Sequence, residues 1–151
     1  MRLGIVILGI LGTLLVAVVV VSLKLTSSQD QATPAVTTTV EDFLQDVANG
    51  DSLAASQLFA SSVKGATVNQ SQIDVLVSSN RPRLVGMADR ITITSYGYQH
   101  TTQGETYTLA ASVDYKEPPP APLTLNAQLV KESGAWKLLA ISFNSGVGNV
   151  N

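Results

Sequence analysis

The feature that most constrains this chain is an uncharged apolar run near its amino terminus, Leu3–Leu23. A helix of these 21 residues is about 31 Å long at about 1.5 Å per residue, close to the hydrocarbon thickness of a bilayer. A cleaved signal peptide has a shorter apolar core, followed by a pair of small residues at its cleavage site. The run fits that pattern poorly, so we expect an uncleaved transmembrane anchor over residues 1–25.

The charges that flank the run favour one orientation in the membrane. Arg2 and the amino terminus lie on one side of the run, and Lys24 lies on the other. The positive-inside tendency then predicts a single-pass protein of the cell membrane, with a cytoplasmic N-terminus and the rest of the chain outside. Gly9, Thr13 and Ala17 recur at a spacing of four residues, a small-residue stripe that lets two membrane helices pack closely.

The composition of the remaining chain argues against several classes of site. Residues 26–151 contain seven basic and eleven acidic side chains, a net charge of −4, which suits nucleic-acid phosphates poorly. The sequence has no cysteine and a single histidine, so the usual sets of metal ligands are missing. We expect no cofactor, no metal site and no nucleic-acid partner.

The pattern of apolar residues divides the rest of the chain into three parts. Residues 26–37 are polar, contain Pro34 and lack apolar periodicity, which predicts a flexible linker. A globular domain is predicted over residues 38–144, and a polar, glycine-containing tail over residues 145–151.

Helix signals come first in the domain. Thr38 and Glu41 fit a capping box at the start of a first helix. Asp51 is placed to cap a second helix and Ser71 a third. The third helix is expected to end before Pro82, because the residue that precedes a proline avoids the helical region.

Strand signals follow, with an apolar period of two. Predicted strands cover residues 91–99, 106–115, 123–129 and 136–143. The last of them is apolar on both faces, which predicts a central strand. Helices followed by strands indicate an α+β fold, in which about three helices pack on a curved antiparallel sheet of about four strands.

Two segments of the domain resemble nuclear transport factor 2-like domains, which have a cystatin-like α+β fold. VEDFLQDVANGDSLAASQLF is similar to their first two helices, joined at Gly50-Asp51, and LTLNAQLVKESGAWKLLAISF is similar to their final hairpin. Small membrane-tethered bacterial members of the superfamily look most similar. The resemblance covers Val40–Phe143 and implies a cone between sheet and helix, which holds a ligand, forms a catalytic pocket or mediates assembly.

Four side chains are candidate ligand-binding groups in such a cone: Asp114, His100, Tyr107 and Tyr96. Asp114 is a residue type depleted in strands, and burial would turn it into a base. His100 would need an oriented carboxylate, and Glu105 is close in sequence. Their more common roles are a solvated strand position, an exposed turn and core packing. The Asp base and its Tyr, Asp or His partner in enzymes of the superfamily cannot be matched residue by residue, so no catalytic residue is assigned.

These observations leave three functions open. The first is a membrane-anchored, non-enzymatic interaction or accessory domain in an envelope or secretion-type assembly, with a protein partner or a homo-oligomer; inner-membrane subunits of type IV secretion systems resemble this layout. The second is a small-ligand-binding or weakly catalytic cone. The third is a pilin-like filament subunit, although the apolar run lacks the expected glutamate and Pro34 is expected to interrupt a continuous helix.

Overall fold

The computed structural model describes residues 32–117, 119 and 121–145. The chain divides into two compact units, residues 1–34 and 35–151, and all four strands belong to the second. The predicted anchor and its small-residue stripe lie outside the described residues. Within the described ranges, no helix has both the length and the apolar character that a membrane crossing needs.

The second unit is an α+β structure whose helices precede its strands. A long helix covers residues 32–49, and its residues from 35 onward belong to this unit. The helices α2 (Ser52–Gln57), α3 (Gln70–Asn80) and the 3-10 helix η1 (Arg81–Leu84) follow. The strands are β1 (Met87–Thr101), β2 (Gly104–Tyr115), β3 (Leu123–Glu132) and β4 (Ala135–Ser145), in the antiparallel order β1-β2-β3-β4. The predicted fold class and the four-stranded antiparallel sheet are confirmed.

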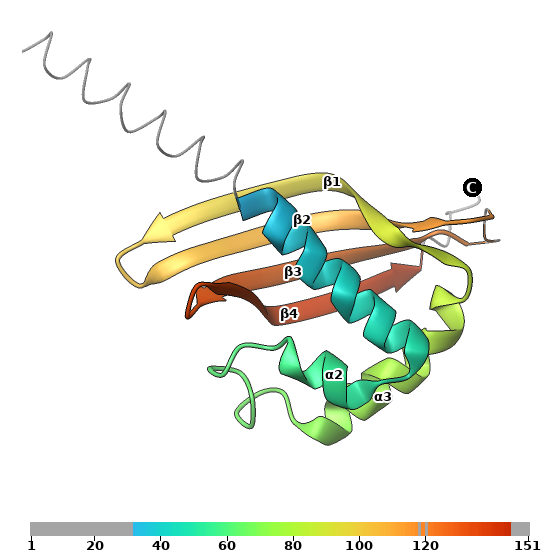
Figure 1. Ribbon diagram of the computed structural model, residues 1–151, viewed down its shortest axis with the longest axis horizontal. Helices are drawn as coiled ribbons and strands as arrows, with labels where there is room; N and C mark the ends of the chain where they lie inside the picture. The colour runs from blue at the N-terminus through green and yellow to red at the C-terminus, as the bar shows by residue number, and fades with distance from the viewer. Residues whose placement is uncertain (1–31, 118, 120, 146–151) are drawn as a thin grey trace, which may run out of the picture. The chain divides into compact units, whose positions relative to one another are not determined.

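The core lies between the long helix and one face of the sheet, here named the inner face. Figure 1 shows this helix crossing the curved sheet, with α2 and α3 beyond β4. Alternate side chains of β2 and β3 point into the core, as their period of two predicted. The helix contributes the fully buried side chains Val36, Val40, Phe43, Leu44 and Val47.

The first helix begins earlier in the chain than predicted. The predicted linker, residues 26–37, is helical in its described part, and Pro34 does not interrupt the helix. Val36 lies one turn before Val40 and is equally buried, so the apolar stripe extends upstream. The predicted cap at Thr38 is therefore wrong, because this residue lies within the helix.

Of the caps predicted for α2 and α3, only the one for α2 is confirmed. Asp51 caps α2 as predicted, since its carboxylate accepts a hydrogen bond from the backbone N–H of Ala54 at 2.9 Å. The cap of α3 is Asn69 and not Ser71. The side chains of Asn69 and Gln72 each accept the other residue's backbone N–H at 2.9 Å, which completes a capping box.

This difference yields a stability prediction for α3. Replacing Asn69 by alanine removes the N-cap and is expected to lower the free energy of unfolding by about 1 kcal/mol. Replacing Ser71 by alanine is the matched control and is expected to change it by less than about 0.5 kcal/mol. Urea unfolding of the full chain measures both values. A larger loss for the Ser71 variant would contradict the observed cap.

β4 lies at an edge of the sheet, which corrects the prediction of a central strand. Phe59 forms a parallel bridge with Leu138. The N–H of Leu138 donates to the carbonyl of Leu58, and the N–H of Ala60 donates to the carbonyl of Leu138, both at 2.8 Å. Segment 58–60, which follows α2, thus pairs with this edge at Leu138.

A register shift in β1 decides which of its side chains face the core. The pairing of β1 with β2 shifts between Ile93 and Ser95, so Thr94 is an extra residue. Such a bulge reverses the alternation of side chains along a strand. Ile93 therefore lies opposite Ala111, whereas Tyr96 lies opposite Leu109, and both positions belong to the inner face.

Candidate functional site

The sheet does not bring the four predicted binding residues into one site. Asp114 and Tyr107 are seven residues apart in β2, and an odd spacing places them on opposite faces of a strand. Tyr107 lies on the inner face with Tyr96, and Asp114 lies on the outer face, the side of the sheet away from the long helix (Figure 1). His100 lies at the end of β1, beside the β1–β2 turn.

Asp114 is engaged on the outer face. Its two carboxylate oxygens accept the hydroxyl of Thr92 at 3.0 and 3.1 Å. The Nε atom of Arg90 lies 3.4 Å from one of them, and the Arg90 side chain is 73% exposed. An exposed ion pair of this kind contributes little free energy. The geometry therefore fits the common role of a solvated strand carboxylate.

His100 forms part of a small exposed cluster at the hairpin tip. Its Nδ1 atom lies 3.8 Å from Oε1 of Glu105, and its side chain is 60% exposed. Oε2 of Glu105 accepts a hydrogen bond from Nζ of Lys131 at 3.1 Å. The Glu105 carboxylate thus bonds to Lys131 and lies near His100 at the surface, so the predicted proximity of His100 and Glu105 exists, at an exposed hairpin tip.

Tyr107 and Tyr96 do meet, as partners in an aromatic cluster. Tyr107 is fully buried, and its ring stacks on that of Tyr96 with centroids 5.8 Å apart. Trp136 and Tyr98 approach it edge-on, with centroids 6.0 and 6.4 Å away. Tyr96 remains 51% exposed. These rings pack in the arrangements that aromatic pairs prefer, which is the core role that tyrosines commonly have in a sheet.

The space between helix and sheet, where a cone would open, is filled. Phe43, Leu44, Tyr107, Leu129 and Leu138 are among its largest fully buried side chains. In the described part of the chain, no charged or hydrophilic residue is buried. No buried side-chain nitrogen or oxygen there lacks a hydrogen-bond partner. Beneath the long helix, the described interior thus offers a ligand no unpaired polar group.

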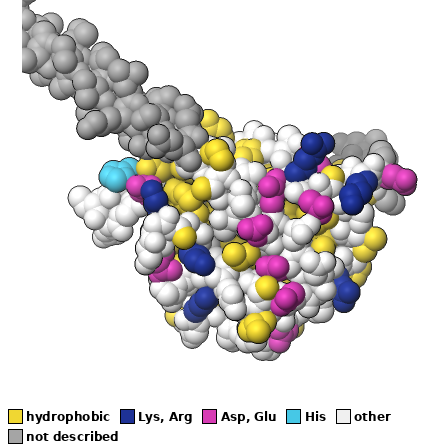
Figure 2. Space-filling model, viewed as in Figure 1, with side chains coloured by type: hydrophobic (Ala, Val, Ile, Leu, Met, Phe, Trp, Pro, Cys, Tyr) yellow, Lys and Arg dark blue, Asp and Glu magenta, His cyan; other side chains and the backbone are white. Residues whose placement is uncertain are grey.

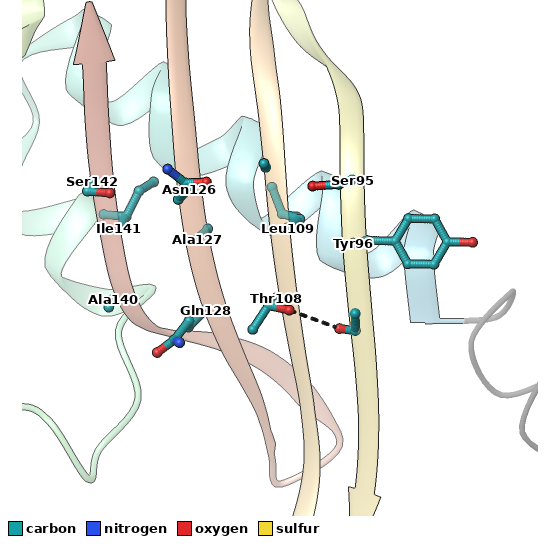
Figure 3. A pocket seen from close by; sticks show the side chains of 12 residues that line it. Ser95, Tyr96, Thr108, Leu109, Asn126, Ala127, Gln128, Ala140, Ile141 and Ser142 are labelled. Atoms are coloured by element: carbon teal, nitrogen blue, oxygen red, sulfur yellow. Dashed lines mark hydrogen bonds between the residues drawn. The ribbon is translucent and has the colours of Figure 1, made fainter.

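The open hollow of the sheet lies on its outer face. It is a shallow trough of about 630 Å³ that crosses all four strands. Figure 3 views it with the long helix behind the strands, and shows the Tyr96 ring pointing beyond the β1 edge, away from the trough. The outer-face residues that line it are Ser95, Gly97, Thr108, Ala110, Asn126, Gln128, Ala140 and Ser142.

The trough is uncharged, and its polar groups are turned to solvent. None of its lining residues carries a charge. The amides of Asn126 and Gln128 both donate and accept hydrogen bonds, and both side chains are exposed. Gly97 has no space for a side chain, because a Cβ atom at this position would lie 2.9 Å from the hydroxyl oxygen of Thr108. By contrast, acidic and basic side chains are interspersed over the helix-bearing face in Figure 2.

Comparison with known proteins addresses the fold alone. No protein family and no curated protein matches the sequence. An NTF2-like protein with a cystatin-like fold from Novosphingobium aromaticivorans aligns with a TM-score of 0.51 at 10% identity, over 86% of this chain and 90% of that one. This chain has an NTF2-like fold. An NTF2-like protein from Cytophaga hutchinsonii aligns more weakly, with a TM-score of 0.40 at 15% identity, over 71% and 92% of the two chains.

The NTF2-like sheet has an outer face that sequence reasoning did not select as a site. The sequence feature that distinguishes this face is the absence of charged residues at alternate positions of β2 and β3. Thr108, Ala110 and Ser112 alternate with the core residues of β2, and Asn126 and Gln128 alternate with those of β3. The solvent-facing side of an antiparallel strand is commonly polar, and at these positions it is polar or small but uncharged.

A second polar hollow adjoins the long helix. Asp42 and Asp46 lie one helical turn apart, and Lys137 lines the same hollow. Burial raises the pKa of Asp46 above its usual value, and the carboxylates of Asp51 and Asp42 raise it further. Among the described residues, no three acidic, histidine or cysteine side chains are arranged to hold a metal ion. The raised pKa of Asp46 makes the stability of the domain depend on pH.

The sign of that pH dependence follows from the raised pKa of Asp46. The folded protein binds this proton more tightly than the unfolded chain, so stability falls as pH rises from about 3.9 through the folded-state pKa. Replacing Asp46 by asparagine removes a like-charge pair at i,i+4 with Asp42. The substitution is expected to raise the free energy of unfolding at pH 7 by about 0.2–0.5 kcal/mol, with the gain vanishing by about pH 3.

Urea unfolding at the two pH values measures this effect, and Asp74 supplies the control. Hydrogen bonds from Ser52 and Gln70 lower the pKa of Asp74. Its replacement by asparagine is therefore expected to lower stability at pH 7, the opposite sign. If the Asp46 variant instead lost stability at pH 7, the like-charge account of this hollow would be wrong.

Proposed function

We propose that this chain is a membrane-anchored, non-enzymatic interaction domain that binds a protein partner through the outer face of its sheet. The single observation that carries the proposal is the contrast between the two faces. The inner face is covered by the long helix and filled by buried side chains, whereas the outer face holds a broad, uncharged trough.

The chemistry of the trough suits a protein partner. Interfaces between proteins are depleted of charged residues at their centre, because a charge that loses its water there is costly. Small side chains such as Gly97, Ala110 and Ala140 permit close approach of another surface. The amides of Asn126 and Gln128 supply hydrogen bonds of either polarity, so the partner need not carry a net charge.

The ligand-binding alternative fits the geometry less well. A cone that binds a small molecule needs an enclosed volume with a few convergent polar groups. Asp114 instead lies at the surface beside Arg90, and His100 lies at the exposed hairpin tip beside Glu105. Tyr107 is enclosed by other aromatic rings. These positions support an interaction domain over a catalytic or ligand-binding one.

In this proposal the run Leu3–Leu23 tethers the domain to the cell membrane, with the domain outside. The tether, its sidedness and a place in an envelope or secretion-type assembly rest on the sequence. The small-residue stripe formed by Gly9, Thr13 and Ala17 would bring two copies of the anchor together. The protein partner is then either another envelope protein or a second copy of the chain.

Replacing Gln128 by arginine tests the binding face. The substitution places a charge at the centre of the trough, where a bound partner would strip its water, and we expect affinity for that partner to fall about 10–100-fold. The measurement is the amount of partner that co-purifies with the full chain from its native membrane. Gln103 lies in the exposed β1–β2 turn, so its replacement by arginine is the matched control. Undiminished co-purification with a folded Gln128 variant would contradict the proposal.

A further inference from the structure

The outer edge of β4 is paired over only part of its length. The segment 58–60 runs beside it and forms two backbone hydrogen bonds, both with Leu138. The chain then turns away at residues 61–63. Within the described residues, no other segment pairs with this edge, so residues 140–144 occupy an open sheet edge.

The register of β4 shows which backbone groups face the open edge. Leu138 directs its N–H and C=O outward, to segment 58–60. Leu138 lies opposite Leu129, and after a one-residue shift Ala140 lies opposite Gln128. Residues in an antiparallel pair alternate between bonding inward and facing outward. The N–H and C=O groups of Ile141 and Phe143 therefore point away from β3, toward the open edge.

An apolar hollow adjoins the same stretch of edge. It has a volume of about 420 Å³ and lies between α3 and β4, with Thr67 and Gln72 among its lining residues. Its apolar walls come from the segment after α2, from α3 and from β4. They are formed by Phe59, Val68, Ile73, Leu76, Leu139 and Ile141.

Beyond its one-residue register shift at Leu139, this edge lacks two of the usual devices that keep another strand away, charge and proline. Edge strands are commonly protected by charged side chains, by proline or by a covering element. The opposite edge of this sheet has such a device, since the carboxylate of Glu41 accepts the N–H of Ile91 in β1 at 3.1 Å. From Leu138 to Asn144, β4 contains neither a charged residue nor a proline.

We propose that the groove between α3 and β4 binds an extended peptide segment of a partner protein. The segment adds a strand beside Ile141 and Phe143, in line with segment 58–60, and inserts a large apolar side chain into the hollow. Backbone pairing supplies affinity in this mode and the side-chain pocket supplies selectivity. A small apolar ligand would fill the hollow but leave the neighbouring backbone groups without partners. The groove shares Ala140 and Ile141 with the trough, and its other lining residues are different.

The probe is a set of seven-residue peptides selected from a random display library against the full chain in lipid nanodiscs. We expect the selected peptides to share one large apolar position. Methylating alternate backbone nitrogens of such a peptide is expected to weaken binding at least tenfold, because those N–H groups pair with β4. Methylation of the intervening nitrogens is expected to change binding less than threefold. Equal tolerance at all nitrogens, or a failure to select any peptide, would overturn strand addition.

Two variants on α3 separate the groove from the rest of the surface. Leu76→Glu places a charge in the hollow and is expected to weaken peptide binding at least tenfold. Val75→Glu changes a side chain that is 62% exposed and does not line the hollow, and is expected to leave binding unchanged. Equal binding to both variants would place the peptide elsewhere. Loss of self-association in Leu76→Glu, without any peptide binding to the unchanged chain, would assign the groove to a second copy and refute the proposal.

Discussion

Replacing Phe43 by alanine is expected to lower the free energy of unfolding by about 3–5 kcal/mol. Phe43 lies in the middle of the helix stripe and is fully buried. Its ring meets that of Phe59 edge to face, with centroids 5.7 Å apart and planes at 87°. The truncation therefore removes both the burial of the ring and a contact that joins the long helix to segment 58–60, beside β4. A loss of this size is a large part of the stability of a small domain.

Urea unfolding of the full chain, followed by tryptophan fluorescence, measures this loss. Trp136 is the only tryptophan in the sequence and is buried on the same side of the sheet, so its emission reports loss of this core. Val75→Ala at an exposed helix position is the control, with an expected change within about 0.5 kcal/mol. A cost below about 1 kcal/mol for Phe43→Ala would mean that the space under the helix is not tightly packed.

A chain in which both Leu11 and Leu15 are replaced by arginine is expected to leave the membrane fraction. The fifteen Leu, Ile and Val side chains of Leu3–Leu23 each favour insertion by about 0.3–0.6 kcal/mol. Each arginine near the centre of a membrane helix costs about 2.5–3.5 kcal/mol. Two arginines therefore cancel most of the gain. Alkaline extraction of membranes, followed by detection of the chain in pellet and supernatant, measures the outcome.

The matched control for the anchor replaces the same two leucines by alanine, which adds no charge, and is expected to keep the chain in the pellet. Protease treatment of intact cells then reports the side on which the domain lies. The proposal expects the domain to be cut. Full protection of residues 38–151, while a known exterior protein is digested, would contradict the outward orientation. Extraction of the unchanged chain by alkali would contradict the anchor itself.

Sequence patterns predicted the parts of the fold that depend on local signals. The alternation in β2 and β3 identified Leu109 and Leu125 as core residues, and both are buried. The cap at Asp51 was found because an aspartate before a helical stripe accepts backbone N–H groups. α3 ends at Asn80, before Pro82, as predicted. The predicted reason is wrong, because Arg81, the residue before the proline, has helical dihedrals (φ −48°, ψ −48°) and begins the 3-10 helix η1.

The features that were missed depend on contacts between distant segments. The first helix begins before Thr38, where Val36 is buried. This burial depends on the folded sheet and cannot be seen in the local sequence. The edge position of β4 depends on segment 58–60 lying beside Leu138, and an apolar strand covered in this way has the same pattern as a central one. The bulge at Thr94 leaves no signal in the local sequence.

The candidate site was predicted less well than the fold, for a physical reason. Rare residue types drew attention to Asp114 and His100, but each lies at the surface and contacts a side chain of a neighbouring strand or turn. The trough is formed by common residues, and Ser95 and Ser142 belong to opposite edges of the sheet. The alignment of these residues in one row across the four strands follows from strand order and register, which the pattern of a single strand does not contain.

The most direct test of the interaction domain is photocrosslinking of the full chain in intact cells. A photoreactive phenylalanine analogue replaces Gln128 in the trough or, as the control, Gln103 in the exposed β1–β2 turn. Because the trough is proposed to contact a protein, the Gln128 position is expected to give one adduct of defined mass that the Gln103 position does not give. The same adduct from both positions, or none from Gln128 in a folded chain, would contradict the account.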